Sequence, residues 1–115
     1  MIVEDNLDMR NLIRSLLEDL ADDIRECSDG EEALAAYIDQ QPDWVLMDIK
    51  MNRMDGLAAT REIVSADPGA KVMIVTAYDD AELREASRRA GACAYVVKEN
   101  MMSLRRILGQ PTRRL

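Results

Sequence analysis

Acidic side chains follow two of the short apolar segments in this sequence. Glu4 and Asp5 follow the first such segment, and Asp48 follows the third. Carboxylates that lie close together repel one another unless a cation neutralises them, and Mg²⁺ prefers oxygen ligands of this kind. If the two segments are neighbouring strands, the pattern predicts a magnesium site in which Asp48 is a candidate nucleophile.

Two later apolar segments end in groups that could bind phosphoryl oxygens. Thr76 offers a hydroxyl donor, and Lys98 offers a fixed positive charge. The backbone carbonyl of Lys50 could add another metal ligand. Strand-end residues of these types more often start turns or favour strands, so each signal alone is weak. Together they form the set needed for phosphoryl transfer to a carboxylate.

Helical and strand patterns alternate along the whole chain. Every connection is long enough for a right-handed crossover, which predicts an α/β fold, a doubly wound five-stranded parallel sheet. The strand order 2-1-3-4-5 places the switch point between the first and third strands, at the acidic groups. Leu12, Leu20 and Ile38 are assigned to inward helix faces. The predicted strands are 1–3, 23–27, 44–48, 71–76 and 92–98, and the predicted helices are 7–20, 31–40, 56–66, 79–90 and 100–108.

Length and composition predict one domain over residues 1–115, with 109–115 as a tail or the start of a linker. The chain has 115 residues, of which 48% are hydrophobic. No uncharged apolar run approaches the roughly 18 residues of a membrane helix and no leader is recognisable, so we expect a cytoplasmic chain without a membrane partner.

The charge is unevenly distributed between the two parts of the sequence. Residues 1–70 carry a net charge of −11 and residues 71–115 a net charge of +4, for a total of −7. The acidic total argues against direct nucleic-acid binding, and the basic part is a candidate partner surface.

Histidine is absent from this chain, whereas cysteine occurs twice. The chain therefore has no histidine that could itself carry a phosphoryl group. Cys27 and Cys93 are expected on opposite edge strands, about 19 Å apart at roughly 4.8 Å per strand spacing, which is beyond disulfide reach. We interpret both as reduced core residues.

The complete residue set resembles the receiver domains of two-component response regulators, which have the CheY-like, or flavodoxin-like, three-layer fold. The resemblance covers essentially the whole chain. The run from Gly91 to Glu99 is most similar to the subgroup whose receivers precede a helix-turn-helix output domain. The residues that carry the resemblance are Glu4-Asp5, Asp48, Met54-Asp55-Gly56, Thr76-Ala77, Gly91-Ala92, Tyr95 and Lys98.

This resemblance implies a role for each residue. Asp48 would accept a phosphoryl group from a sensor histidine kinase or a histidine phosphotransfer protein, so the chain would catalyse only its own phosphorylation and dephosphorylation. Mg²⁺ would be held by Glu4, Asp5, Asp48 and the Lys50 carbonyl. Thr76 and Lys98 would hold the phosphoryl oxygens, and Tyr95 would be the aromatic switch.

The region 79–108 would carry the resulting change to a second copy or an effector. We expect its exposed arginines to take part, namely Arg84, Arg88, Arg89, Arg105 and Arg106.

Two positions depart from the family pattern. Asn52 and Glu99 stand where the family usually has proline, and the bond before Glu99 is expected to be trans or strained.

Two alternative functions compete with the receiver interpretation. A phosphohydrolase of the haloacid-dehalogenase type also uses a strand-end aspartate, but it needs a second acid two residues later, where this chain has Lys50. A binding module that has lost phosphorylation is disfavoured because no catalytic position is missing. Turnover of a generic phosphatase substrate distinguishes the first alternative, and acetyl phosphate labelling distinguishes the second.

Overall fold

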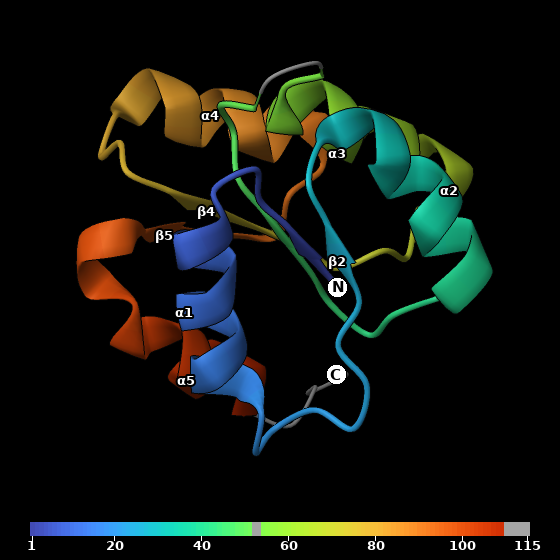
Figure 1. The fold of residues 1–115 in the computed structure, drawn as a ribbon. Coiled ribbons are helices and arrows are strands. Elements are labelled where there is room, and N and C mark those ends of the chain that lie inside the picture. The colour runs from blue at the N-terminus through green and yellow to red at the C-terminus, as the bar shows by residue number, and fades with distance from the viewer. Residues whose placement is uncertain (52–53, 110–115) are drawn as a thin grey trace, which may run out of the picture.

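The central feature of the fold is a parallel sheet. The computed structural model describes residues 1–51 and 54–109, and within these the strand order is β2-β1-β3-β4-β5 (Figure 1). The register pairs Val3 of β1 with Met47 of β3, so the segments that follow these strands leave the sheet side by side. The predicted fold class and strand order are confirmed. The strands are β1 (Ile2–Val3), β2 (Glu26–Cys27), β3 (Val45–Met47), β4 (Val72–Thr76) and β5 (Ala94–Val97).

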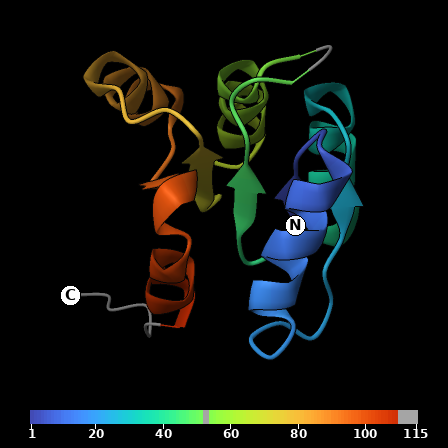
Figure 2. The same cartoon turned by 60° about the vertical axis from the view of Figure 1, so that its left-hand side comes forward.

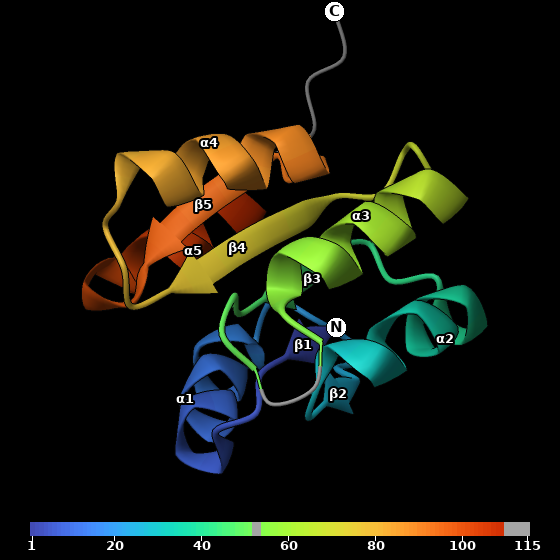
Figure 3. The same cartoon turned by 90° about the horizontal axis from the view of Figure 1, so that it is seen from above.

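Two layers of helices cover the sheet (Figures 2 and 3). On one face, Ile13, Leu17 and Leu104 pack against strand residues such as Leu46. On the other face, Tyr37 and Ile63 belong to a second core cluster. Because helices cover both faces, β3 and β4 are buried along their whole lengths and read as continuous apolar runs. The helices are α1 (Leu7–Leu17), α2 (Gly30–Gln40), α3 (Gly56–Ala66), α4 (Ala81–Ala90) and α5 (Met102–Gly109).

Four of these helices begin at a side-chain cap. In each case the side-chain oxygen of an Asn or Asp accepts a hydrogen bond from a backbone N–H of the first turn. These caps fix where the four helices begin at the site edge of the sheet. The caps are Asn6, Asp29, Asp55 and Asp80. At the other end of α4, Gly91 adopts φ 107°, and a Cβ there would lie 2.8 Å from Val64.

Three predicted inward side chains are exposed instead. Leu12, Leu20 and Ile38 are 46%, 43% and 58% exposed. α1 ends at Leu17 rather than at residue 20, because the N–H groups of Leu20 and Ala21 both donate to the Leu17 carbonyl in a tight turn. Ile38 is next to the buried Tyr37, and a step of about 100° around the helix turns it toward solvent.

Smaller corrections concern the edges of the sheet. β2 contains only Glu26–Cys27 instead of five residues, which suits a polar edge segment. A short 3₁₀ turn, Lys98–Asn100, precedes α5, which begins at Met102 rather than at residue 100. Cys27 is buried, as predicted, but Cys93 lies before β5 and is exposed.

Other sequence-based expectations have mixed outcomes. The Lys98–Glu99 peptide bond is trans, one of the two forms expected. Asn52 and residues 110–115 lie outside the described residues, so predictions about them stay predictions. Within the part of the chain that is described, no helix is long and apolar enough to cross a membrane.

Candidate functional site

Asp48 lies directly beyond the last residue of β3. Its backbone N–H donates to the Val3 carbonyl at 3.0 Å, which continues the pairing with β1. Its Oδ1 accepts a hydrogen bond from the Ile49 N–H at 3.0 Å. Only 8% of Asp48 is exposed, so this carboxylate is largely removed from water.

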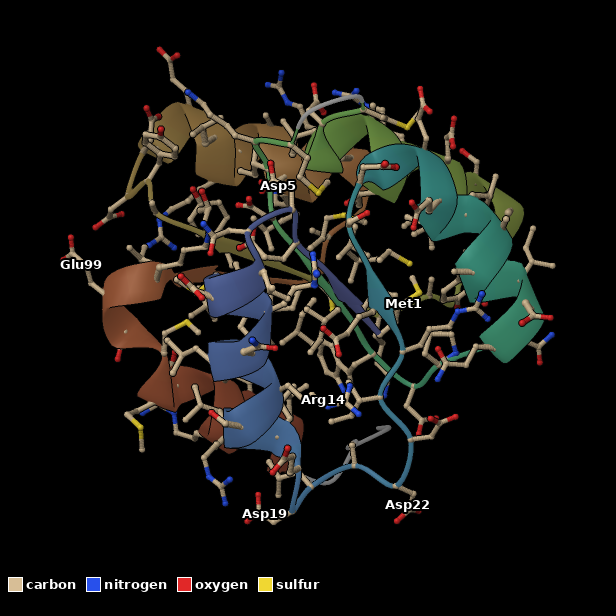
Figure 4. The ribbon with its side chains drawn as sticks, in the orientation of Figure 1. Met1, Asp5, Arg14, Asp19, Asp22 and Glu99 are labelled. Carbon is tan, nitrogen blue, oxygen red and sulfur yellow. The ribbon has the colours of Figure 1, made fainter. Side chains whose placement is uncertain are left out.

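Two further carboxylates share this crevice with Asp48. Glu4 and Asp5 follow β1, and each of the three offers an oxygen within 4.8 Å of the others. Figure 4 shows Asp5 at the edge of the sheet where β1 ends. The predicted meeting of these three residues is confirmed, and its cause is the parallel pairing of β1 with β3.

Burial and mutual repulsion control the ionisation of these acids. Burial, followed by the negative charge of Glu4, raises the pKa of Asp48 to about 7. Burial and Glu4 likewise raise the pKa of Asp5. The pKa of Glu4 is lowered, because burial acts upward but hydrogen bonding to Lys98 and Asp48 outweighs it. Without a bound metal ion, the crevice therefore does not stabilise all three acids in their ionised forms.

Lys98 brings a positive charge into the same crevice from the end of β5. Its Nζ donates to Glu4 Oε1 at 2.7 Å and lies 3.6 Å from Asp48 Oδ1. Burial acts to lower the pKa of Lys98, but these carboxylates outweigh burial and raise it. The ammonium stays charged and bonds Glu4 more closely than Asp48.

Thr76 ends β4 at the same edge of the sheet. Met47 pairs with Ile74, so Thr76 and Asp48 leave neighbouring strands at similar heights. Thr76 is fully buried, and its Oγ1 accepts a hydrogen bond from the Tyr78 N–H at 3.3 Å. The register therefore brings Thr76 to the same edge of the sheet as Asp48, and its role toward a phosphoryl group stays a prediction.

Tyr95 and Lys50 both contact Tyr78, a residue that the sequence analysis did not select. The Tyr95 hydroxyl donates to the Tyr78 carbonyl at 2.6 Å, and the Arg84 guanidinium lies 4.5 Å from the Tyr95 ring centroid. The Lys50 ammonium lies 4.5 Å from the Tyr78 ring centroid. The only signal for Tyr78 in the sequence is its position two residues after Thr76.

The surface over α4, β5 and α5 is hollowed by a pocket of about 400 Å³, to which Tyr95, Arg84 and Arg106 contribute. Arg105 was predicted to take part in this surface, but its guanidinium is engaged with another segment. Its guanidinium bonds the Leu16 carbonyl and both carboxylate oxygens of Asp19, so it fastens α5 to α1.

The donor set of the crevice fits a magnesium ion. Glu4, Asp5 and Asp48 supply closely spaced carboxylate oxygens, which a hard divalent cation prefers and which otherwise repel one another. Mg²⁺ commonly takes one or two carboxylates and keeps several waters, so three carboxylates offer enough ligands for it.

A doubly wound sheet thus carries acids, a lysine and a threonine at one edge. The family model for the response regulator receiver domain matches residues 1–108. The chain therefore belongs to the receiver domain family of two-component signalling. Members of this family are signalling switches rather than enzymes with a separate substrate.

Individual relatives agree with this assignment. Chemotaxis protein CheY of Halobacterium salinarum is 38% identical over 98 residues, which cover 85% of this chain and 82% of that protein. Transcriptional regulatory protein PdtaR of Mycobacterium tuberculosis is 39% identical over 99 residues, which cover 85% of this chain and 48% of that protein. The chain thus spans about half the length of PdtaR.

A solved structure shows the same fold. The CheX-CheY-BeF3-Mg complex from Borrelia burgdorferi contains a chain that matches with a TM-score of 0.84 and 27% identity, over 94% of this chain and 84% of that chain. Membership of the receiver family does not favour the haloacid-dehalogenase alternative.

Proposed function

We propose that Asp48 is the phosphoacceptor of a signalling switch. The observation that carries the proposal is the crevice in which Glu4, Asp5 and Asp48 lie within 4.8 Å of one another beside Lys98. The related CheY in its complex with beryllofluoride and Mg²⁺ supports the same chemistry here. Residues 1–108 would form the receiver, and 109–115 would lead out of it.

Each residue has a defined task in the transfer. An Asp48 oxygen attacks the phosphorus of a phosphohistidine on a sensor kinase or a phosphotransfer protein, and the P–N bond breaks as the P–O bond forms. Glu4, Asp5, Asp48 and the Lys50 carbonyl would hold Mg²⁺, which when bound neutralises charge on the phosphoryl oxygens. Loss of the phosphoryl group to water would return the chain to its starting form.

Lys98 and Thr76 would stabilise the transferred group. The Lys98 ammonium is already in the crevice, 3.6 Å from Asp48. The Thr76 hydroxyl accepts from the Tyr78 N–H and, among the described residues, donates no hydrogen bond, so its proton can be donated to a phosphoryl oxygen. Both are positive or donating groups placed where negative charge increases.

The change would reach partners through the surface over α4, β5 and α5. Tyr95 lies at this surface, and its hydroxyl bond to Tyr78 links it to the residue that Thr76 contacts. A second copy of the chain or an effector would bind here when Asp48 is phosphorylated. Exposed ion pairs with Arg84, Arg88 and Arg89 would contribute about 0.2–1 kcal/mol each, so the association should be modest and sensitive to salt.

The direct test is labelling with acetyl phosphate and Mg²⁺. We expect one hydroxylamine-sensitive phosphate per chain by intact-mass spectrometry, and none on Asp48→Asn. Asp55→Asn is the matched control, because Asp55 caps α3 outside the crevice and should leave labelling intact. Equal labelling of the Asp48→Asn variant would remove Asp48 from the proposal.

The surface is tested separately by analytical ultracentrifugation with and without beryllofluoride. The parent should associate only in the activated state, and Tyr95→Ala and Thr76→Ala should reduce the difference. Identical sedimentation of the parent in both states would exclude a homodimer and leave a different partner for this surface.

A further inference from the structure

Lys50 contacts an aromatic ring although it lies close to an acidic crevice. Its ammonium is 4.5 Å from the centroid of Tyr78, a contact that joins the loop after β3 to the loop after β4. Within residues 1–51 and 54–109, Lys50 makes no ion pair. Tyr78 is 45% exposed, so burial contributes little to holding the pair together.

Tyr78 also contacts both residues proposed to transmit the signal. Its N–H donates to Thr76 Oγ1 at 3.3 Å, and its carbonyl accepts from the Tyr95 hydroxyl at 2.6 Å. Through its ring, Tyr78 additionally contacts a residue that follows Asp48 by two positions. One exposed tyrosine is therefore in contact with the phosphoacceptor loop, the hydroxyl donor and the aromatic switch.

We propose that the Lys50 ammonium moves from the Tyr78 ring to the phosphoryl group when Asp48 is phosphorylated. The proposal rests on the proposed function. Phosphorylation adds about −1.5 to −2 charges two residues from Lys50, whose flexible four-carbon stem allows its ammonium to turn. A charge-assisted bond to a phosphoryl oxygen is stronger than an exposed cation–π contact, so the phosphoryl group wins the competition.

When the Lys50 ammonium leaves the ring, Tyr78 would be held less firmly, and its carbonyl accepts the hydrogen bond of the Tyr95 hydroxyl. The contact between Lys50 and Tyr78 then opposes phosphorylation, and loss of this contact accompanies the change at Tyr95. This connection acts through a side chain on the β3–α3 loop, so it is separate from the hydrogen bond that the Thr76 hydroxyl would donate. Lys50 and Tyr78 are positioning residues in this scheme.

The affinity for beryllofluoride in the presence of Mg²⁺ measures the competition between the Tyr78 ring and the phosphoryl mimic for the Lys50 ammonium. Tyr78→Leu removes the competing ring but keeps Lys50, so binding should tighten about two- to fivefold, the size of an exposed cation–π contact. Lys50→Met removes the charge that would pair with the phosphoryl mimic, so binding should weaken, although the backbone carbonyl remains. In the Lys50→Met background, Tyr78→Leu should change nothing further.

Two control variants separate this effect from a general change in the protein. Tyr78→Phe keeps the ring and should bind beryllofluoride like the parent. Lys71→Met removes a second cation–π contact, in which the Lys71 ammonium lies 5.1 Å from the Trp44 ring centroid. Trp44 directly precedes β3, and Lys71 directly precedes β4. Lys71→Met too should leave the affinity unchanged.

The tyrosine ring resonances provide a second measurement by NMR. In the metal-free chain, Lys50→Met should shift the Tyr78 ring protons, and Mg²⁺ with beryllofluoride should shift those of the parent in the same direction. If the parent binds beryllofluoride but Tyr78→Leu binds with the same affinity and the ring protons do not shift, the competition is refuted while the proposed function stands. If the parent does not bind at all, the proposed function fails and this inference fails with it.

Discussion

Replacing Asp48 by asparagine should stabilise the metal-free protein, and the gain should grow with pH. The pKa of Asp48 is raised from 3.8 to about 7, chiefly by burial and then by Glu4. A carboxyl whose pKa is higher in the folded chain than in the unfolded chain binds more protons when folded. Its ionisation therefore costs folding stability between these two pH values, and the cost is complete above about pH 7.

The size of the effect follows from the two pKa values. At about 1.4 kcal/mol per pH unit, the cost is near zero below pH 3.8, about 2 kcal/mol at pH 5 and about 4 kcal/mol at pH 8. The asparagine has nearly the same shape and carries no charge, so it avoids this cost. The stability difference between Asp48→Asn and the parent should thus increase by about 2–3 kcal/mol from pH 5 to pH 8.

Urea unfolding in EDTA at several pH values measures this difference. Glu62→Gln is a control on the exposed surface of α3 and should show no comparable increase. Saturating Mg²⁺ should reduce the advantage of the asparagine variant, because the cation binds the ionised carboxylate of the parent. A stability difference that stays constant from pH 5 to pH 8 in EDTA would refute the electrostatic account of the crevice.

Three further perturbations test other parts of the structure. Asp5→Ala should weaken Mg²⁺ binding in calorimetry yet raise the unfolding free energy in EDTA, because it removes one of three mutually repelling acids; a clearly less stable variant in EDTA would contradict this. Lys98→Met should cost about 2–4 kcal/mol in urea unfolding without metal, since the buried Glu4 loses its cation. A loss below about 0.5 kcal/mol would show that the pair is unimportant. Gly91→Ala should lower the unfolding free energy by about 1–3 kcal/mol, because φ 107° and the close approach to Val64 both disfavour a Cβ. An unchanged midpoint in thermal or urea unfolding would argue against that strain.

The arrangement of the site could be predicted from the sequence because it depends mainly on topology. Once β1 and β3 are neighbouring parallel strands, residues after them must meet at one edge, whatever their rotamers. The choice of partner by each cation could not be predicted in this way. Lys98 bonds Glu4 more closely than Asp48, and Arg105 bonds the Leu16 carbonyl of α1 and Asp19 just beyond that helix. Both choices depend on distances between segments more than 80 residues apart.

Helix boundaries and faces were predicted less well for a similar reason. The apolar spacing through Leu20 is compatible with a longer first helix, and only the turn at Leu17 ends it. Tyr78 was missed because a tyrosine in a loop has no periodic pattern, and its importance comes from what lies around it. Cys93 looks like a core residue by type, but it precedes an edge strand and is exposed.

The attachment of α5 to α1 has a consequence for the local opening of the chain. Arg105 joins segments that are far apart in the sequence. In the described residues, the ion pairs of α4 instead lie within one short segment, where Arg84 pairs with Asp79, and Glu85 pairs with both Arg88 and Arg89. Contacts confined to one segment open with it and do not hold it to its neighbours. We therefore expect backbone amides of α4 to exchange with deuterium faster than those of the middle of α1, because α4 opens locally while the sheet stays folded.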